Sequence, residues 1–499
     1  ILPLWGGYAY RPWIFYSHKG EHPATEEYVY EDYHHNGKWY ADDFTPEYEP
    51  ESRPYACCEM GAGMMCCYYY RFIYPYKSVD ALANIKVASG CNFIGYYMFQ
   101  GGTNPIGKHG TYLNESQVPE LSYDYHAAPW EFVQLRESYK RLKSIHFFTQ
   151  YFGQLLAPME TVLPEGASEI DPKDLKTLRF AVRTNGKSGF IFLNNFQDHL
   201  TMTKKEQEEI DLHVNGEALS FQISIDSEEN AILPFFLELD GILLRQANAQ
   251  PVLRTTVNGG TVYVFMIPDG MQGSFRFEEN VEISGGSGTM SETREYILPI
   301  DMESTLFTVK KDDNEMDVLV INRSLANSLY IIKNGGLIFT EEALLEDAQG
   351  NLRLETVNAC NTVLTYPPAL LSISDAAVSC GDGENVLGIY EVNTKEQVIP
   401  TAVSSPTDRH HMICLPEDAL DGLKDALLQI DYRGDIGHLF LDDVMIHDNF
   451  PNGDTWEIGL MEHREKLKKH PLVLVIAPVR EGATVNVESA MAARNEEVK

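Results

Sequence analysis

The sequence predicts a multidomain protein in which an α/β portion is followed by all-β domains, and three observations lead to this prediction. An apolar β-type run over residues 92–99 follows a helical pattern and ends in the polar loop Gly101–Asn104, as a buried parallel strand does. From Thr161 onward, the pattern changes to short alternating strands between turn residues. The chain has 499 residues, too many for one hydrophobic core, and roughly three or four domains are expected.

Residues 1–158 are predicted to form the C-terminal portion of a (β/α)8 TIM barrel. A short strand, Tyr55–Cys58, precedes a helix that ends at Gly90 and carries the apolar residues Val79, Leu82, Ile85 and Val87. The strand at 92–99 completes one strand–helix–strand step, and a helix over 131–156 is expected to pack outside it. Because a whole barrel takes about 250 residues, about five or six βα units are expected to be missing.

The rest of the chain is predicted to form three all-β domains: a β-sandwich at 159–284, a second β-rich domain at 285–373 and a jelly-roll-like domain at 374–499. The sandwich is predicted from alternating runs such as 178–182 and 189–193, which are separated by the turn residues Asn185 and Gly186. Runs with β spacing also occur near the end of the chain, at 438–441 and 472–477.

The charge balance argues against two classes of partner. Lys and Arg number 39 and Asp and Glu number 73, which gives a net charge of −34. Such a surface repels phosphate backbones and anionic membranes, so neither nucleic acid nor a membrane is expected as a partner. The longest apolar runs, such as Leu472–Ala477, are far shorter than the roughly 20 residues of a membrane helix.

The chain has eight cysteines, too few in this length for a disulfide scaffold. Cys57-Cys58 and Cys66-Cys67 allow two interpretations, a four-thiolate metal site or buried structural thiols, and their spacing favours the second. Reduced thiols suggest a cytoplasmic protein. The chain starts at Ile1 without a basic and apolar leader, so we expect either a processed protein or an excerpt.

Glu59 is the first candidate for chemistry. It is expected directly after the strand Tyr55–Cys58 and before Gly61 and Gly63, where a carboxylate at a strand end can act as nucleophile or general base. The alternative is a structural carboxylate that caps the next helix or forms a salt bridge with a neighbouring loop.

Three motifs in order resemble glycoside hydrolase family 35, the β-galactosidases. They are Glu59 with Gly63, then Tyr97-Met98-Phe99-Gln100-Gly101-Gly102-Thr103-Asn104, then Ser122-Tyr123-Asp124-Tyr125 followed by Ala128-Pro129. The resemblance extends to Gly189–Gln197 in the β region and to three C-terminal motifs: Asp431–Asp435, Asp448-Asn449-Phe450 and Trp456–Leu460.

The resemblance implies retaining hydrolysis of terminal β-galactosides, with Glu59 as the nucleophile. It places Tyr125, Tyr97 and Tyr123 at the sugar site, where a phenol can stack on a pyranose ring and donate a hydrogen bond. Tyr96 is expected to be a packing residue. The implied ligand is a galactose-containing oligosaccharide or glycoside, and neither a cofactor nor a metal is implied.

The chain departs from the family pattern in its second carboxylate. The family's acid/base lies in an Asn-Glu pair upstream of the nucleophile, but no such pair precedes Glu59. Asn114-Glu115 and Asn314-Glu315 are Asn-Glu pairs, but they lie downstream of Glu59, in a predicted loop and in a β region, and are not expected to serve as the acid/base. The expected source is the missing N-terminal barrel segment, and the expected protein partners are that segment or a second copy of the chain.

Two further departures concern the sugar site. Gly61 and Met64 stand where relatives usually carry aromatic residues, and His126 stands where they usually carry an Asp. Because the acid/base half of the barrel is absent, the alternative hypothesis is a non-catalytic carbohydrate-binding or assembly fragment.

Overall fold

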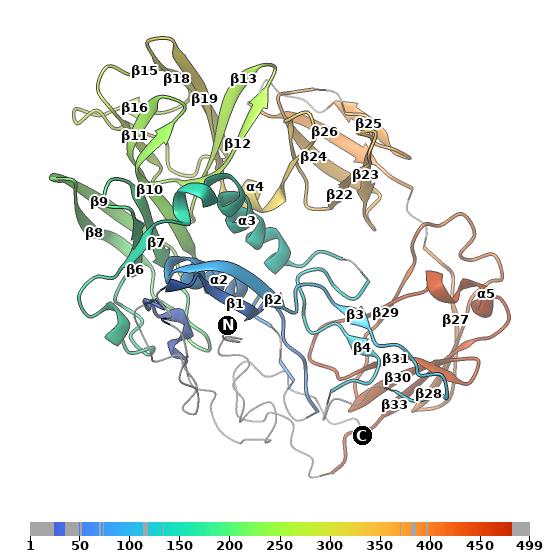
Figure 1. Cartoon of the computed structure of the whole chain (residues 1–499). Helices are drawn as coiled ribbons and strands as arrows, with labels where there is room; N and C mark the ends of the chain where they lie inside the picture. The colour runs from blue at the N-terminus through green and yellow to red at the C-terminus, as the bar shows by residue number, and fades with distance from the viewer. Residues whose placement is uncertain are drawn as a thin grey trace.

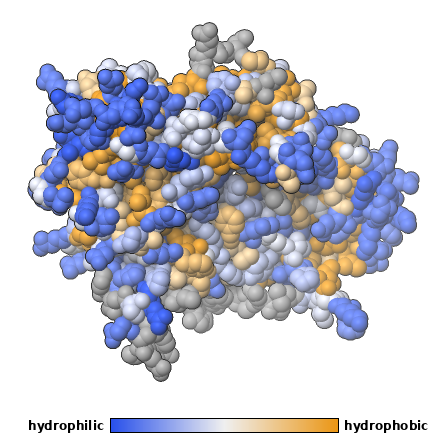
Figure 2. All heavy atoms as spheres, turned by 45° about the horizontal axis from the view of Figure 1, so that its top comes forward, coloured by the Kyte–Doolittle hydropathy of each residue, from blue (hydrophilic) through white to orange (hydrophobic). Residues whose placement is uncertain are grey.

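The computed structural model describes residues 24–34, 49, 52–68, 71–72, 74–112, 118–132, 134–369, 371–380, 386–395 and 398–481. Strands far outnumber helices in these residues, which confirms the all-β character predicted for most of the chain. Figure 1 shows the blue and teal N-terminal elements between the green and yellow sheets on one side and the red C-terminal sheets on the other. Figure 2 shows apolar side chains reaching the surface between hydrophilic ones on the face drawn.

The predicted strand–helix–strand step is confirmed. β1 (Tyr55–Gly61) and β2 (Cys91–Tyr97) pair in parallel, and α2 (Lys77–Ala88) connects them. Gly90 follows the helix with a φ of 103°, a backbone conformation that favours glycine. Within the described residues this sheet has two strands, so they do not by themselves form a barrel.

β1 is longer than predicted, which corrects the placement of Glu59. Met60 and Gly61 pair with Tyr96 and Tyr97 of β2. Glu59 therefore lies within the strand, two residues before its end, rather than directly after it.

α3 (Glu137–Leu156) begins later than the predicted start at residue 131. The Trp130 amide donates to the Gln134 carbonyl at 2.8 Å and closes a turn there. Arg136 is still extended, with φ −76° and ψ 164°, so the helix begins only after it. Once formed, α3 buries Leu142, Ile145 and Phe148 in the same core as α2.

The middle of the chain forms two large sheets, which we call the central sheets. The eight-stranded sheet consists of β5 (Glu160–Val162), β6 (Arg179–Thr184), β7 (Gly189–Asn194), β10 (Asn230–Leu239), β11 (Ile242–Ala247), β14 (Ser274–Phe277), β16 (Thr289–Met290) and β17 (Tyr296–Ile297). The five-stranded sheet consists of β12 (Gln250–Val257), β13 (Gly260–Ile267), β15 (Glu282–Gly285), β18 (Ser304–Lys311) and β19 (Asn314–Asn322). β8 (Lys205–Val214) and β9 (Glu217–Ile225) form a separate hairpin.

Two further β units follow. The first contains β20 (Leu329–Ile331), β21 (Leu337–Phe339), β24 (Cys360–Tyr366), β25 (Ala377–Cys380) and β26 (Gly388–Asn393), with a hairpin of β22 (Ala343–Glu346) and β23 (Leu352–Glu355). The second, which we call the C-terminal module, contains β27 (Ala402–Thr407), β28 (His410–Cys414), β30 (Ile436–Leu441), β31 (Val444–Asn449) and β33 (Leu472–Ala477), with the pair β29 (Leu427–Ile430) and β32 (Trp456–Gly459). Its two sheets share one hydrophobic core.

Strand pairing crosses two of the domain boundaries predicted from sequence. β15, which ends at Gly285, pairs with β18, and β14 pairs with β17, so both central sheets cross the boundary at residue 284. β25 and β26 join β24, so one sheet also crosses residue 373. The strands on either side of residues 284 and 373 therefore belong to the same sheets.

Short elements complete the description: α4 (Arg323–Ser328), α5 (Arg464–Leu467), β3 (Gly102–Thr103), β4 (Ser122–Tyr123) and the 3-10 turns Glu26–Tyr28, Ala167–Glu169 and Met461–His463. In the part of the chain described, no helix is long and apolar enough to cross a membrane.

A buried ionic network joins the N-terminal helices to the central sheets. Arg141 on α3 donates to Asp80 on α2 at 2.8 Å and to Glu229 at 3.3 Å. Arg323 on α4 donates to the same Glu229 from Nε at 3.1 Å. Each of these side chains is at most 4% exposed. Buried charges of this kind depend on their partners, so the network couples three parts of the fold.

Candidate active site

The three tyrosines predicted for the sugar site lie together. Tyr97, the last residue of β2, shares a hydrogen bond between hydroxyl groups with Tyr123 of β4. The rings of Tyr123 and Tyr125 stack with centroids 4.0 Å apart, and Tyr97 meets Tyr125 at 6.3 Å and 61°. Tyr125 is only 5% exposed, whereas the other two are half-buried. We call these three residues the tyrosine cluster.

The strand that carries Glu59 ends beside this cluster. Gly61, two residues after Glu59, is the register partner of Tyr97. Gly63 packs against the next loop so closely that a Cβ there would lie 2.5 Å from the Tyr125 carbonyl oxygen. The absence of a side chain at Gly63 thus lets the β1 end and the Tyr125 loop meet. Glu59 itself is half-buried.

Asp124 fixes the backbone of the tyrosine loop. Tyr125 and His126 have φ values of 51° and 53°, and the Asp124 carboxylate accepts hydrogen bonds from the amides of His126 and Glu131. The Arg136 guanidinium also binds it, with Nη2 2.7 Å from Oδ2. Burial is the largest single influence and raises the pKa of Asp124, but the charge and hydrogen bonds of Arg136, the charge of His126 and the Glu131 amide together lower it below its usual value. Asp124 is therefore an ionised anchor of the loop.

Arg136 links this anchor to α3. Its Nη1 donates to the Ala127 carbonyl at 2.8 Å, and its guanidinium lies 4.1 Å from the centre of the Trp130 ring. Arg136 thus binds Asp124 and Ala127 in the tyrosine loop and Trp130 in the segment that follows it. Arg136 is one of the site residues that sequence reasoning missed.

His126 is a buried residue with hydrogen-bond partners on both ring nitrogens. It is 4% exposed and stacks on Tyr74 at 5.8 Å. Its Nδ1 lies 2.6 Å from the Met64 carbonyl and its Nε2 2.7 Å from the Asn452 amide nitrogen. The first contact requires a proton on Nδ1, so Nε2 accepts from Asn452 of the C-terminal module. His126 is a structural link between Met64 and that module.

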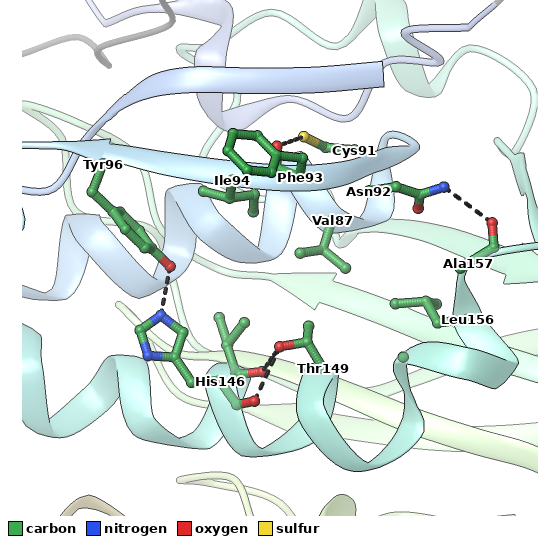
Figure 3. Close-up of a pocket in the computed structure, with 12 residues that line it drawn as sticks. Val87, Cys91, Asn92, Phe93, Ile94, Tyr96, His146, Thr149, Leu156 and Ala157 are labelled. Atoms are coloured by element: carbon green, nitrogen blue, oxygen red, sulfur yellow. Dashed lines mark hydrogen bonds between the residues drawn. The ribbon is translucent and has the colours of Figure 1, made fainter. Parts of the chain in front are cut away.

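Tyr96 points away from the tyrosine cluster, toward α3. Its hydroxyl lies 2.7 Å from His146 Nε2, and burial raises its pKa. Figure 3 shows this pair in a cavity of about 240 Å³ between β2, α2 and α3. Adjacent strand residues face opposite sides, which explains the different roles of Tyr96 and Tyr97.

Two carboxylates near the tyrosine cluster, those of Glu131 and Asp124, are bound by other side chains. Glu131 accepts from the Ser122 hydroxyl at 2.8 Å and lies 3.0 Å from His447 Nε2. Asp124 is paired with Arg136. Glu315 pairs with Lys310 in an exposed hairpin, and Asn114 and Glu115 lie outside the described residues. None of these observations identifies an acid/base.

The cysteine pairs lie in and after β1. Cys57 and Cys67 are buried, and Cys58 and Cys66 are half-buried. Burial raises the pKa of the Cys67 thiol to about 12. Among the described residues, no group of three or more His, Cys, Asp and Glu side chains is placed to hold a metal ion.

In comparisons with known proteins, no family model and no curated protein matches this sequence. The site's description therefore rests on its own geometry. Arg136 and Asn452 hold the loop of the site through Asp124 and His126. The sequence alone does not indicate that these residues are partners.

Proposed function

We propose that this chain is part of a retaining β-galactosidase-like glycoside hydrolase that removes terminal β-galactosides. The observation that carries the proposal is the gathering of Tyr97, Tyr123 and Tyr125 beside the end of the strand that holds Glu59. Phenols that gather beside a strand carrying a carboxylate are suited to bind a pyranose and present its anomeric carbon, and Tyr97 and Tyr123 are only half-buried.

In this proposal Glu59 is the nucleophile. Its carboxylate attacks the anomeric carbon as the glycosidic bond breaks, and water later hydrolyses the glycosyl–enzyme ester. Retention requires a second carboxyl group about 5 Å away to protonate the leaving oxygen. Asp124 is paired with Arg136, and Glu131 accepts a hydrogen bond from Ser122. We therefore assign the role of acid/base to a carboxylate of the missing N-terminal barrel segment.

The proposal includes a barrel that is completed by further polypeptide. Parallel sheets normally have several strands and are covered on both faces, whereas the described part of this one has two. Phe93 on β2 is 59% exposed beside the cavity shown in Figure 3, which fits a surface that another segment covers. We propose that this segment is the N-terminal part of the barrel or belongs to a second copy of the chain.

A cytoplasmic location is part of the same proposal. Cys66 and Cys67 are adjacent free thiols, which suits a reducing compartment.

Covalent labelling tests the nucleophile. A 2-deoxy-2-fluoro-β-galactoside with a dinitrophenol leaving group needs no acid catalyst to form the glycosyl–enzyme, so the chain alone can be tested. Mass spectrometry is expected to find the adduct on Glu59 and to find none in Glu59→Gln. The exposed Glu137→Gln serves as the control and should label like the parent. Labelling of Glu59→Gln, or of another carboxylate in the parent, would disprove the assignment.

A second candidate function is carbohydrate binding without turnover. It is favoured by the engagement of both neighbouring carboxylates. Measurable galactose binding in a chain that never forms the adduct would select this candidate. A chain that shows neither binding nor labelling would refute both.

A further inference from the structure

A single carboxylate of the C-terminal module holds the strand that carries Tyr123. Asp448 on β31 is 2% exposed, and it accepts three consecutive backbone amides: Glu120 at 2.6 Å, Leu121 at 3.0 Å and Ser122 at 3.0 Å. These residues are 326 to 328 positions away in the chain. Figure 1 shows β4 beside β31, where this contact forms.

Three successive amides directed at one ion define the position of that backbone segment. Each is a charge-assisted hydrogen bond, roughly twice as strong as a neutral one. Ser122 begins β4, so the anchored segment leads directly into Tyr123 and, two residues later, Tyr125. Moving this backbone would move the stacked rings of the tyrosine cluster.

The same strand makes a second link to the site. His447, next to Asp448, accepts from Trp456 Nε1 at Nδ1, which leaves the proton on Nε2 facing Glu131 at 3.0 Å. Glu131 in turn accepts from the Ser122 hydroxyl. Both links from β31 therefore end at Ser122 or its immediate neighbours.

The C-terminal module also attaches to the rest of the fold through contacts that do not involve Asp448. Arg71, which is fully buried, donates to the Asp435 carboxylate and to the Asp435 carbonyl, each at 2.7 Å. Tyr68 donates to the other Asp435 oxygen at 2.7 Å. None of these contacts with Asp435 involves the tyrosine loop. The three hydrogen bonds of Asp448 therefore hold the backbone of residues 120–122 in addition to this attachment.

We propose that Asp448 is a positioning residue for the tyrosine cluster, so that the C-terminal module is part of the sugar site. The sugar-binding part of this inference rests on the proposed function. The part that concerns the position of the phenols does not.

The test uses Asp448→Asn, with Asp448→Ala as the more severe variant and Asp443→Asn as the control. Asp443 is exposed in the turn before β31, and its φ of 60° suits Asn. The Asp448→Asn change keeps one acceptor oxygen but turns an NH2 group toward at least one amide. Exchange of the amides of residues 120–122 should then be about tenfold faster or more, measured by hydrogen–deuterium exchange.

Two readouts separate positioning from folding. Tetranitromethane should nitrate Tyr125 faster in Asp448→Asn than in the parent, because burial protects this ring in the anchored loop. Galactose affinity should fall about tenfold. Asp443→Asn should match the parent in all three measurements.

The outcomes are distinct. Unchanged exchange and nitration in both Asp448 variants would overturn the inference. Faster exchange and nitration with unchanged galactose affinity would overturn the role at the sugar site. A parent chain that neither binds galactose nor forms the adduct on Glu59 would refute the proposed function, while nitration would still decide whether Asp448 positions the phenols.

Discussion

The central sheets and the site around the tyrosine cluster are held together in different ways. In the sheets, strand pairs such as β6–β7 and β18–β19 pair without a register shift, β7 is buried along its whole length, and β18 buries alternate residues. At the site, side chains from distant segments hold the loops, as Arg136, Asp448 and Asn452 do. The comparison teaches that the sheets are specified by local pattern, whereas the site is specified by long-range polar contacts.

The largest effect on stability is expected at the ionic network that joins α2 and α3 to the central sheets. Arg141→Met removes the cation shared by Asp80 and Glu229 and leaves buried carboxylates with fewer partners. We expect a loss of about 3–5 kcal/mol in the free energy of unfolding. Urea denaturation measures it.

Lys140→Met is the control for Arg141→Met. Lys140 is the next residue toward the N-terminus on α3, and its partner Glu341 is 61% exposed. A change below about 1 kcal/mol is expected. Equal effects at the two positions would contradict the role given to the network.

A smaller effect is expected where β1 meets the tyrosine loop. Gly63→Ala would place a Cβ 2.5 Å from the Tyr125 carbonyl oxygen and 2.8 Å from Ala127 Cα. The backbone must move, at a cost of about 1–3 kcal/mol, and galactose binding should weaken. Chemical denaturation and a binding titration check the two effects.

Gly153→Ala on α3 is the matched control for Gly63→Ala. Nothing lies within 4 Å of a Cβ at Gly153, and alanine is a better helix former, so a gain of about 0.5–1 kcal/mol is expected. If Gly63→Ala were as well tolerated as Gly153→Ala, the close contact with the tyrosine loop would not be real.

The pH dependence of the site follows from Asp124. Its pKa is lowered in the folded state, because Arg136, His126 and the Glu131 amide together outweigh burial, so its stabilising contribution is present above the unfolded pKa of about 3.9. That contribution is lost as pH falls through the lower folded value. The stability difference between the parent and Asp124→Asn should therefore shrink as pH falls from 6 to 3, measured by urea midpoints.

Glu165→Gln, at an exposed position in the loop before β6, provides the baseline for the Asp124 measurement. It should differ little from the parent at each pH. A constant difference between the parent and Asp124→Asn across this pH range would disprove the ionised anchor.

The smallest effect is expected on the surface of the central sheets. Arg254 and Asp240 form a pair 2.7 Å apart in which each side chain is 42% exposed. Water and salt screen such a pair, so Arg254→Gln should change stability by about 0.5 kcal/mol or less, measured by thermal unfolding. A larger loss would show that surface ion pairs also hold these sheets.

Much of the local structure could be predicted from the sequence. The helix before Gly90, the parallel strands on either side of it, and the alternating strands near residues 179–194 all follow from period and turn residues. The start of α3 could not be predicted, because Arg136 is held extended by its partners Asp124 and Ala127. The domain boundaries at 284 and 373 lie inside sheets because pairing follows hydrogen bonds between distant strands.

For the candidate site, the sequence by itself led to Glu59, because a carboxylate that follows a strand and precedes glycines is a local pattern, and the resemblance to glycoside hydrolase family 35 added the three tyrosines. Only the tertiary structure decided that the tyrosines stack, that His126 is a link and that Asp448 anchors β4. The physical reason is that hydrogen bonds and ion pairs depend on distances of about 3 Å between groups that can be hundreds of residues apart, and periodicity along a chain carries no information about those distances.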